Sequence, residues 1–157
     1  NCMTDLSEGD KAPNFKLPAD NNTNIELSDY SGQNVVLYFY PKDNTPGCTT
    51  QACSFRDSIK SFEELDAIII GISKDSVKKH ENFKAKYDLN FSLASDENDE
   101  VCETYGVWKE KSMYGKKFWG IERTTFLIDK NGKIAKIWRK VKVKDHIEDV
   151  KDALHNL

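Results

Sequence analysis

Residues 35–53 read VVLYFYPKDNTPGCTTQAC, and this stretch decides the fold. Its first six residues are apolar or aromatic, which predicts a buried β-strand. A turn containing proline follows, and a helix is predicted to begin with Thr45 as its N-cap. Pro46 then takes the first helical position, where a missing N–H has no consequence, and Cys48 takes the third.

Cys48 is therefore a candidate nucleophile. The N–H groups in the first turn of a helix have no intrahelical acceptor, and together with the helix dipole they favour an anion. A cysteine in this position is expected to be held partly as thiolate, the form of cysteine that attacks electrophiles. Without further motifs, the alternative interpretation of Cys48 is an inert buried cysteine at the start of a helix.

The regions on either side of this stretch extend the pattern into an α/β fold. The predicted helix carries an apolar stripe, which leaves Cys53 to one side, and the stripe consists of Cys48, Ala52, Phe55, Ile59 and Phe62. Strands are predicted at 15–17, 24–27, 67–72, 91–94, 124–128 and 134–138, and helices at 73–87, 99–105 and 145–157. This order predicts a thioredoxin-like domain over residues 3–157, with a central mixed sheet flanked by helices and extra N-terminal strands.

Composition excludes several classes of protein. The net charge of −3 gives no reason to expect binding to nucleic acid. The basic residues in 109–117 and 139–144 are expected to lie on a solvated surface. The longest apolar runs are about six residues, far short of the ~20 that a membrane span needs. No charged leader is visible, so we expect a cytoplasmic protein, with a removed targeting segment left open.

The four cysteines do not suggest a disulfide scaffold, because such scaffolds are shorter and denser in cysteine. The three histidines (His80, His146 and His155) lie far along the chain from Cys48 and Cys53, without zinc-finger spacing. We therefore expect no metal and no bound cofactor.

The spacing of Cys48 and Cys53 restricts what the pair can do. On one regular helix, five residues separate the two Cα atoms by roughly 8.6 Å. A disulfide requires Cα atoms within about 7 Å, so the pair cannot bond while the helix is intact. Either the two cysteines never pair, or the start of the helix unwinds when they do.

These residues resemble the peroxiredoxins. Pro41-x-x-x-Thr45-x-x-Cys48 is similar to the active-site signature of that family, and a second cysteine five residues later resembles its bacterioferritin comigratory protein group (BCP, or PrxQ). The likeness continues in order through most of the chain. Its further segments are Gly9 to Pro18, Tyr38 to Lys42, Gly106 to Trp108, Arg123 to Asp129 and Gly132 to Ile134.

The resemblance implies a thiol peroxidase of the atypical two-cysteine type, acting on hydrogen peroxide and organic hydroperoxides. Cys48 would be the peroxidatic cysteine and Cys53 the resolving one, joined after oxidation in an intramolecular disulfide. Thr45 and Arg123 match the other site residues of the family, and Pro41 matches the proline that shields the cysteine. Thioredoxin or a glutaredoxin-like dithiol would be the reductant, and we expect a monomer.

Other interpretations remain for individual residues and for the whole chain. Cys2 is expected to be a terminal thiol and Cys102 a packed residue without redox function, while Trp108, Trp119 and Trp138 are expected to pack or form a rim. A second interpretation of the whole chain is a disulfide reductase or isomerase, which would reduce disulfides without peroxide. A third is a non-enzymatic redox sensor or holdase, which would turn over slowly and bind unfolded proteins.

Overall fold

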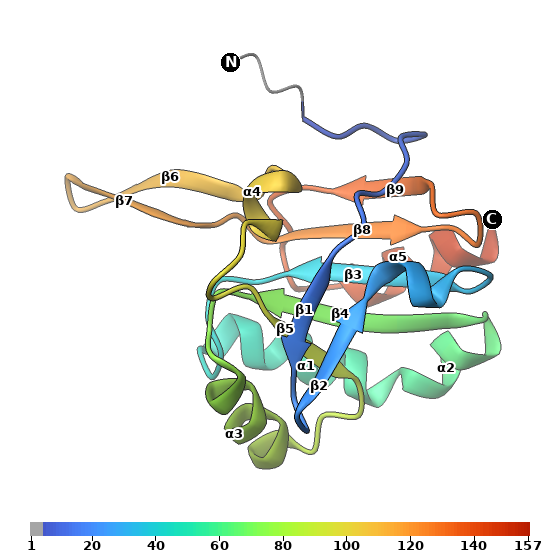
Figure 1. Ribbon diagram of the computed structural model, residues 1–157, viewed down its shortest axis with the longest axis horizontal. Helices are drawn as coiled ribbons and strands as arrows, with labels where there is room; N and C mark the ends of the chain where they lie inside the picture. Colours follow the sequence, from blue (N-terminus) through green and yellow to red (C-terminus); the bar gives the residue numbers. More distant parts are fainter. Residues whose placement is uncertain (1–4) are drawn as a thin grey trace.

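The computed structural model describes residues 5–157. The expectation for Cys2 and the first two residues of the predicted domain, 3 and 4, lie outside this part of the chain. A seven-stranded sheet forms the centre of the molecule, in the order β2-β1-β5-β4-β3-β8-β9 (Figure 1). Its strands are β1 (Lys16–Ala19), β2 (Thr23–Glu26), β3 (Asn34–Phe39), β4 (Ala67–Ser73), β5 (Ser92–Ser95), β8 (Thr124–Ile128) and β9 (Ile134–Trp138).

The sheet is mixed, as the sequence predicted. Strand β4 runs parallel to both β3 and β5, whereas β8 is antiparallel to β3 and to β9. Strands β1 and β2 form the N-terminal hairpin and join the sheet through β5. The helices are the 3-10 turn η1 (Leu27–Tyr30), α1 (Pro46–Asp57), α2 (Ile59–Glu64), α3 (Val77–Tyr87), α4 (Val101–Thr104) and α5 (His146–His155).

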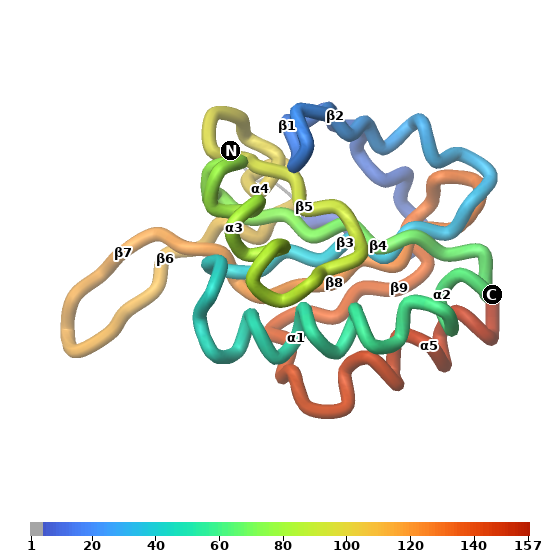
Figure 2. The backbone as a smooth tube through the Cα atoms, turned by 90° about the horizontal axis from the view of Figure 1, so that it is seen from below, coloured from blue at the N-terminus to red at the C-terminus, as the bar shows by residue number. Residues whose placement is uncertain are grey.

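Strand β3 lies between the two halves of the hydrophobic core, and all six of its residues are buried. Alternate side chains of a strand point to opposite faces. Val35, Leu37 and Phe39 therefore join one apolar cluster, while Val36 and Tyr38 join the other. Helices α1, α2 and α5 cover this second face (Figure 2). Burial on both faces explains why the strand is apolar without alternation.

Two predicted helices differ from the observed ones. The single helix expected after Cys48 is divided at Ser58 into α1 and α2, although Phe55 and Phe62 of its apolar stripe are both fully buried. The helix expected to begin at Ser73 begins at Val77 instead. Ser73 still belongs to β4, and the Ser76 side chain caps α3 by accepting a hydrogen bond from Lys79 N at 3.2 Å.

The sequence analysis missed a second hairpin, formed by β6 (Trp108–Met113) and β7 (Lys116–Ile121). It projects from the body of the molecule (Figures 1 and 2). Tyr114 and Gly115 make its turn, both with positive φ, as a two-residue hairpin loop requires. Most of its residues are exposed and polar, so no alternation of buried and solvated positions reveals it. Trp119 is an exposed side chain of this hairpin.

His146, at the start of α5, is a buried neutral histidine. Its Nε2 lies 2.8 Å from Thr125 Oγ1, and its ring meets Trp138 edge-on at 5.5 Å. Burial lowers the pKa of His146 to about 4. An unfolded chain binds this proton below about pH 6.5, whereas the folded protein does not bind it until about pH 4.

We therefore expect stability to fall as the pH drops from about 6.5 to 4, with His146 contributing at most about 3 kcal/mol to that loss. His146→Gln should make the free energy of unfolding, measured in urea, vary less with pH across this range. His155→Gln, at an exposed position of the same helix, is the matched control. Equal pH dependence in the two variants would contradict the assignment to His146.

Candidate active site

The predicted strand, turn and helix start are present, with the strand one residue earlier than predicted, at Asn34–Phe39, and the helix start at the predicted residues. Thr45 has an extended conformation, with φ −92° and ψ 156°, and occupies the N-cap of α1. Its carbonyl accepts a hydrogen bond from Thr49 N at 2.8 Å, which closes the first turn. Pro46 is the first helical residue and Cys48 the third, as predicted.

The tertiary structure brings Arg123 to Cys48. The Cys48 side chain is buried, and Arg123 Nη2 lies 3.3 Å from its Sγ in hydrogen-bonding geometry. Arg123 directly precedes β8, whose Thr124 pairs with Phe39 at the end of β3. This antiparallel register places Arg123 beside the loop that leads from β3 into α1. The guanidinium is thus a cationic donor directed at the sulfur.

Gln51 holds the same guanidinium from the other side. Arg123 Nη1 donates to Gln51 Oε1 at 2.6 Å, and the Gln51 side chain is fully buried. Gln51 lies one helical turn after Cys48 on the face of α1 that turns toward the core. The sequence analysis missed it, although a polar residue three positions after a candidate nucleophile, on an apolar face, is a usable signal.

Gln51→Met should slow the reaction with peroxide, because Arg123 loses a charge-assisted hydrogen bond worth about 1.5–3 kcal/mol and is less well oriented. That energy corresponds to a rate reduction of about tenfold or more, measured by stopped flow under single-turnover conditions. Gln51→Glu retains the acceptor and should keep more of the rate. A Gln51→Met enzyme with wild-type rate would show that Arg123 is positioned without Gln51.

Gly47 provides space for Arg123. A Cβ atom at residue 47 would lie 3.2 Å from Arg123 Nη2, closer than most side-chain carbons approach a neighbouring atom. The residue before Cys48 therefore leaves room for the guanidinium to reach the sulfur.

Thr45 is the N-cap by position, but its side chain makes no capping hydrogen bond. The predicted N-cap position is thus confirmed, without a side-chain cap. The hydroxyl instead donates to the Lys42 carbonyl at 2.9 Å, within the turn that precedes the helix. With its proton directed there, the Thr45 oxygen keeps free lone pairs and acts as an acceptor.

Among the described residues, no hydrogen bond or disulfide joins Cys48 to Pro41 or Cys53. Pro41 is an exposed residue of the loop between β3 and α1. Cys53 is half-buried on the same unbroken helix as Cys48, and both thiols are free. Cys102 is also free, and burial followed by the charge of Asp96 raises its pKa strongly, which keeps it an unreactive thiol.

Lys111 adds a second cation near the site, from the hairpin that the sequence analysis missed. Its ammonium donates to the Ile121 carbonyl, two residues before Arg123. Burial, and then the positive charge of Arg123, lower the pKa of Lys111.

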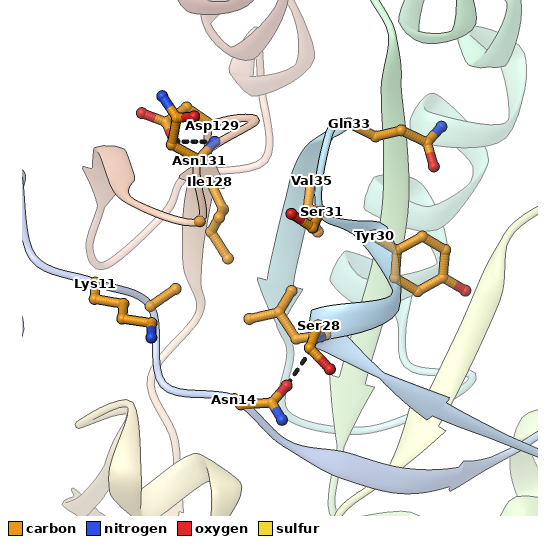
Figure 3. Close-up of a pocket in the computed structure, with 13 residues that line it drawn as sticks. Lys11, Asn14, Ser28, Tyr30, Ser31, Gln33, Val35, Ile128, Asp129 and Asn131 are labelled. Atoms are coloured by element: carbon orange, nitrogen blue, oxygen red, sulfur yellow. Dashed lines mark hydrogen bonds between the residues drawn. The ribbon is translucent and has the colours of Figure 1, made fainter.

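Other possible sites offer less chemistry. A cavity of about 460 Å³ lies at the opposite end of β3 from Cys48 (Figure 3). Val35 and Ile128 contribute to its walls, Ser28 and Asn131 to its rim, and none of the predicted site residues line it. Across residues 5–157, no cluster of three or more histidine, cysteine or acidic side chains has metal-binding geometry. Over the same residues, no helix is long and apolar enough to cross a bilayer.

Comparison with known proteins agrees with this geometry. The model of the AhpC/TSA family matches residues 8–137. Peroxiredoxin Bcp of Bacillus subtilis (strain 168) is 54% identical over 149 residues, which cover 95% of each chain. The chain belongs to the AhpC/TSA family, as a peroxiredoxin of the Bcp/PrxQ group.

Solved structures of related proteins confirm the thioredoxin-like peroxiredoxin fold. The crystal structure of a cysteine-to-serine mutant of Xylella fastidiosa PrxQ matches with a TM-score of 0.92 at 42% identity, covering 98% of both chains. A Xanthomonas campestris bacterioferritin comigratory protein, in a study of its alkyl peroxide reduction activity, matches with a TM-score of 0.86 at 44% identity, covering 90% of both chains. The predicted family, fold and enzyme class are thus confirmed.

Proposed function

We propose that this peroxiredoxin reduces hydrogen peroxide and organic hydroperoxides through Cys48. The Cys48 thiolate attacks one oxygen of the O–O bond, which breaks, and the other oxygen leaves as hydroxide or alkoxide and takes a proton. Cys48 becomes a sulfenic acid. The observation that carries this proposal is the guanidinium of Arg123, which lies against the buried sulfur and is held by Gln51. The alkyl peroxide activity of the Xanthomonas campestris relative supports organic substrates.

Arg123 acts on the transition state as well as on the thiolate. A free cysteine is about 3% ionised at pH 7, so complete ionisation accelerates its reaction by at most ~30-fold. A larger acceleration requires stabilisation of the charge that moves onto the peroxide oxygens as their bond breaks. The donors available beside Cys48 Sγ are the Arg123 guanidinium and the free N–H groups of the first turn of α1.

Thr45 orients the substrate as an acceptor. Because its hydroxyl donates to Lys42 O, its oxygen is available to the O–H of a bound hydroperoxide. By the family's pattern, Pro41, in the loop after β3, shields the cysteine. These two roles extend the family's site pattern to the residues at the same positions here.

Cys53 resolves the sulfenic acid. The Cys53 thiolate attacks Cys48 Sγ, a disulfide forms and water leaves. Both cysteines lie on the continuous helix α1, whose regular geometry separates their Cα atoms by roughly 8.6 Å, beyond the limit of about 7 Å. The first turns of α1 therefore unwind before the bond forms. Thioredoxin or a glutaredoxin-like dithiol then reduces the disulfide by thiol–disulfide exchange.

One equivalent of hydrogen peroxide should convert the reduced protein into a single chain with an internal disulfide. It should lose two of its four thiols and two hydrogens of mass, and should migrate as a monomer on a non-reducing gel. Amides of residues 45–55 should exchange faster than in the reduced protein, because that part of the helix has unwound. Thiol counting, intact mass and hydrogen exchange measure these three results.

Cys102→Ala is the control for this experiment, because Cys102 is fully buried and should not react. A covalent dimer through Cys53 would rule out the intramolecular disulfide. An oxidised protein in which the helix remains protected from residue 48 to 53 would rule out the unwinding.

A further inference from the structure

Asp43 is a buried carboxylate in the loop that carries Pro41 and Thr45. Its Oδ1 accepts a hydrogen bond from Tyr40 Oη at 2.6 Å, and its Oδ2 lies 2.6 Å from Nδ1 of His80 in α3. Its side chain is only 4% exposed. A buried carboxylate is stable only when it is paired and hydrogen-bonded, and both of its oxygens satisfy that condition here.

His80 is fully buried, and both of its ring nitrogens face oxygen atoms. Nδ1 faces the Asp43 carboxylate, and Nε2 lies 3.0 Å from the Ala94 carbonyl. The carbonyl can only accept, so Nε2 carries a proton. A second proton lies between Nδ1 and Asp43. The two side chains share it across 2.6 Å, so Asp43 and His80 form a buried hydrogen-bonded pair.

Further polar groups enclose this pair. Asp75 Oδ2 accepts hydrogen bonds from Asp43 N at 2.7 Å and from Ser73 Oγ at 2.8 Å, and Lys79 lies 4.0 Å from its other oxygen. Burial and the charge of Asp43 raise the pKa of Tyr40 well above its usual value, so Tyr40 remains a neutral donor.

The residue after Asp43 is also tied to α3. Asn44 has a positive φ of 61°, and its Oδ1 accepts hydrogen bonds from Tyr87 Oη at 3.2 Å and Lys86 Nζ at 3.3 Å. A cavity of about 270 Å³ opens between the loop and α3, lined in part by Lys42 and Asn44. Polar links rather than close apolar packing therefore hold the loop against the helix at this point.

The far half of α1 is tied to the same helix. Arg56 Nη1 donates to the carbonyl of Tyr87, the last residue of α3, at 2.6 Å, and Asn90 Nδ2, in the loop after α3, donates to the Arg56 carbonyl at 3.2 Å. The links to α3 at residues 43–44 and at Arg56 thus enclose the segment that contains both Cys48 and Cys53. Figure 2 shows α3 beside the start of α1.

We propose that the buried, hydrogen-bonded Asp43–His80 pair is a clamp that holds the Cys48 loop in its peroxide-reactive arrangement and sets how readily α1 unwinds. The effect of this clamp on disulfide formation rests on the function proposed above, in which Cys53 resolves the Cys48 sulfenic acid. Asp43 and His80 are positioning residues, since neither of them touches the Cys48 sulfur. A weaker clamp speeds closure of the Cys48–Cys53 disulfide and slows the attack on peroxide. A stronger one lengthens the life of the sulfenic acid and favours its further oxidation to sulfinic acid.

The Asp43–His80 hydrogen bond can be tested on the reduced protein without peroxide. By NMR, the proton between His80 Nδ1 and Asp43 should exchange slowly with solvent and give a far-downfield signal, which the exposed His155 lacks. Absence of this signal would overturn the pair and the proposal with it.

Asp43→Asn tests the clamp, because it removes the charge with little change of shape. Amides of residues 43–53 should exchange about tenfold faster or more in the reduced protein, while those of β3 and β8 keep the wild-type rate. Disulfide formation after one equivalent of peroxide should be several-fold faster than in the wild type. At high peroxide, less sulfinic acid should accumulate on Cys48, as measured by mass. Asp66→Asn is the control, since it breaks an exposed ion pair with Lys130 far from the loop.

Unchanged exchange at residues 43–53, or an equal increase throughout the protein, would overturn the clamp. If Asp43→Asn does not fold, the same measurements on His80→Gln decide, because glutamine can donate to Asp43 without a charge. If exchange changes as expected but no Cys48–Cys53 disulfide forms in any variant, the role of Cys53 is wrong and the clamp on the loop remains.

Discussion

Cys48→Ser should abolish peroxide consumption, the largest effect expected of any single substitution in this protein. A serine hydroxyl at the third position of α1 has the same surroundings, including Arg123, but is not ionised at neutral pH and is a far weaker nucleophile. The measurement is the loss of hydrogen peroxide in the presence of a dithiol reductant. Normal turnover in this variant would end the assignment of Cys48 as the reacting residue.

Cys53→Ser provides the matched comparison, because it changes the other cysteine of the same helix. Cys48 keeps its contacts in this variant, so about one equivalent of peroxide should still be consumed. The sulfenic acid then has no partner within the chain and should be trapped by a dimedone-type reagent. Multiple turnovers with a dithiol in Cys53→Ser would show that the resolving cysteine is dispensable.

Arg123→Ala should slow the reaction of Cys48 with peroxide by about 10²–10³-fold, the loss typical of removing one preorganised donor from a transition state. The thiolate fraction should also fall, because the guanidinium lies 3.3 Å from Sγ. Rates measured as a function of pH separate the two effects. A transition-state role predicts a deficit that persists at a pH where the thiol is fully ionised.

A deficit that disappears at high pH would leave Arg123 only the role of stabilising the thiolate. Arg123→Lys is the informative companion variant. It keeps a positive charge but cannot donate to Gln51 and to Cys48 at the same time with the fixed geometry of a guanidinium. We expect its rate to lie between those of the wild type and Arg123→Ala.

The part of the site nearest in sequence was predictable, because its determinants are local. A run of six apolar residues is compatible with a strand buried on both faces. Thr45 and Pro46 specify a helix start through backbone geometry, and this start places Cys48 among the free N–H groups. The boundaries of α1 and α3 were less certain, because several serines in each region are able to cap or end a helix.

The partners of Cys48 depend on contacts between distant parts of the chain. Arg123 was predicted only through the family's pattern. Nothing local to it indicates that the pairing of β8 with β3 brings it to residue 48. Gln51 was missed because its importance lies in the contact with Arg123, and the β6–β7 hairpin was missed because its exposed residues carry no buried stripe.

The sequence by itself determined the strand, the turn and the helix start that present Cys48, since those follow from backbone preferences and apolar periodicity over fewer than twenty residues. Only the tertiary structure decided what surrounds the sulfur. Strand register brings Arg123 to it, and burial of Asp43 against His80 ties the Cys48 loop to α3. The physical reason is that ion pairs and hydrogen bonds between remote residues gain their strength from burial, and burial is a property of the assembled fold.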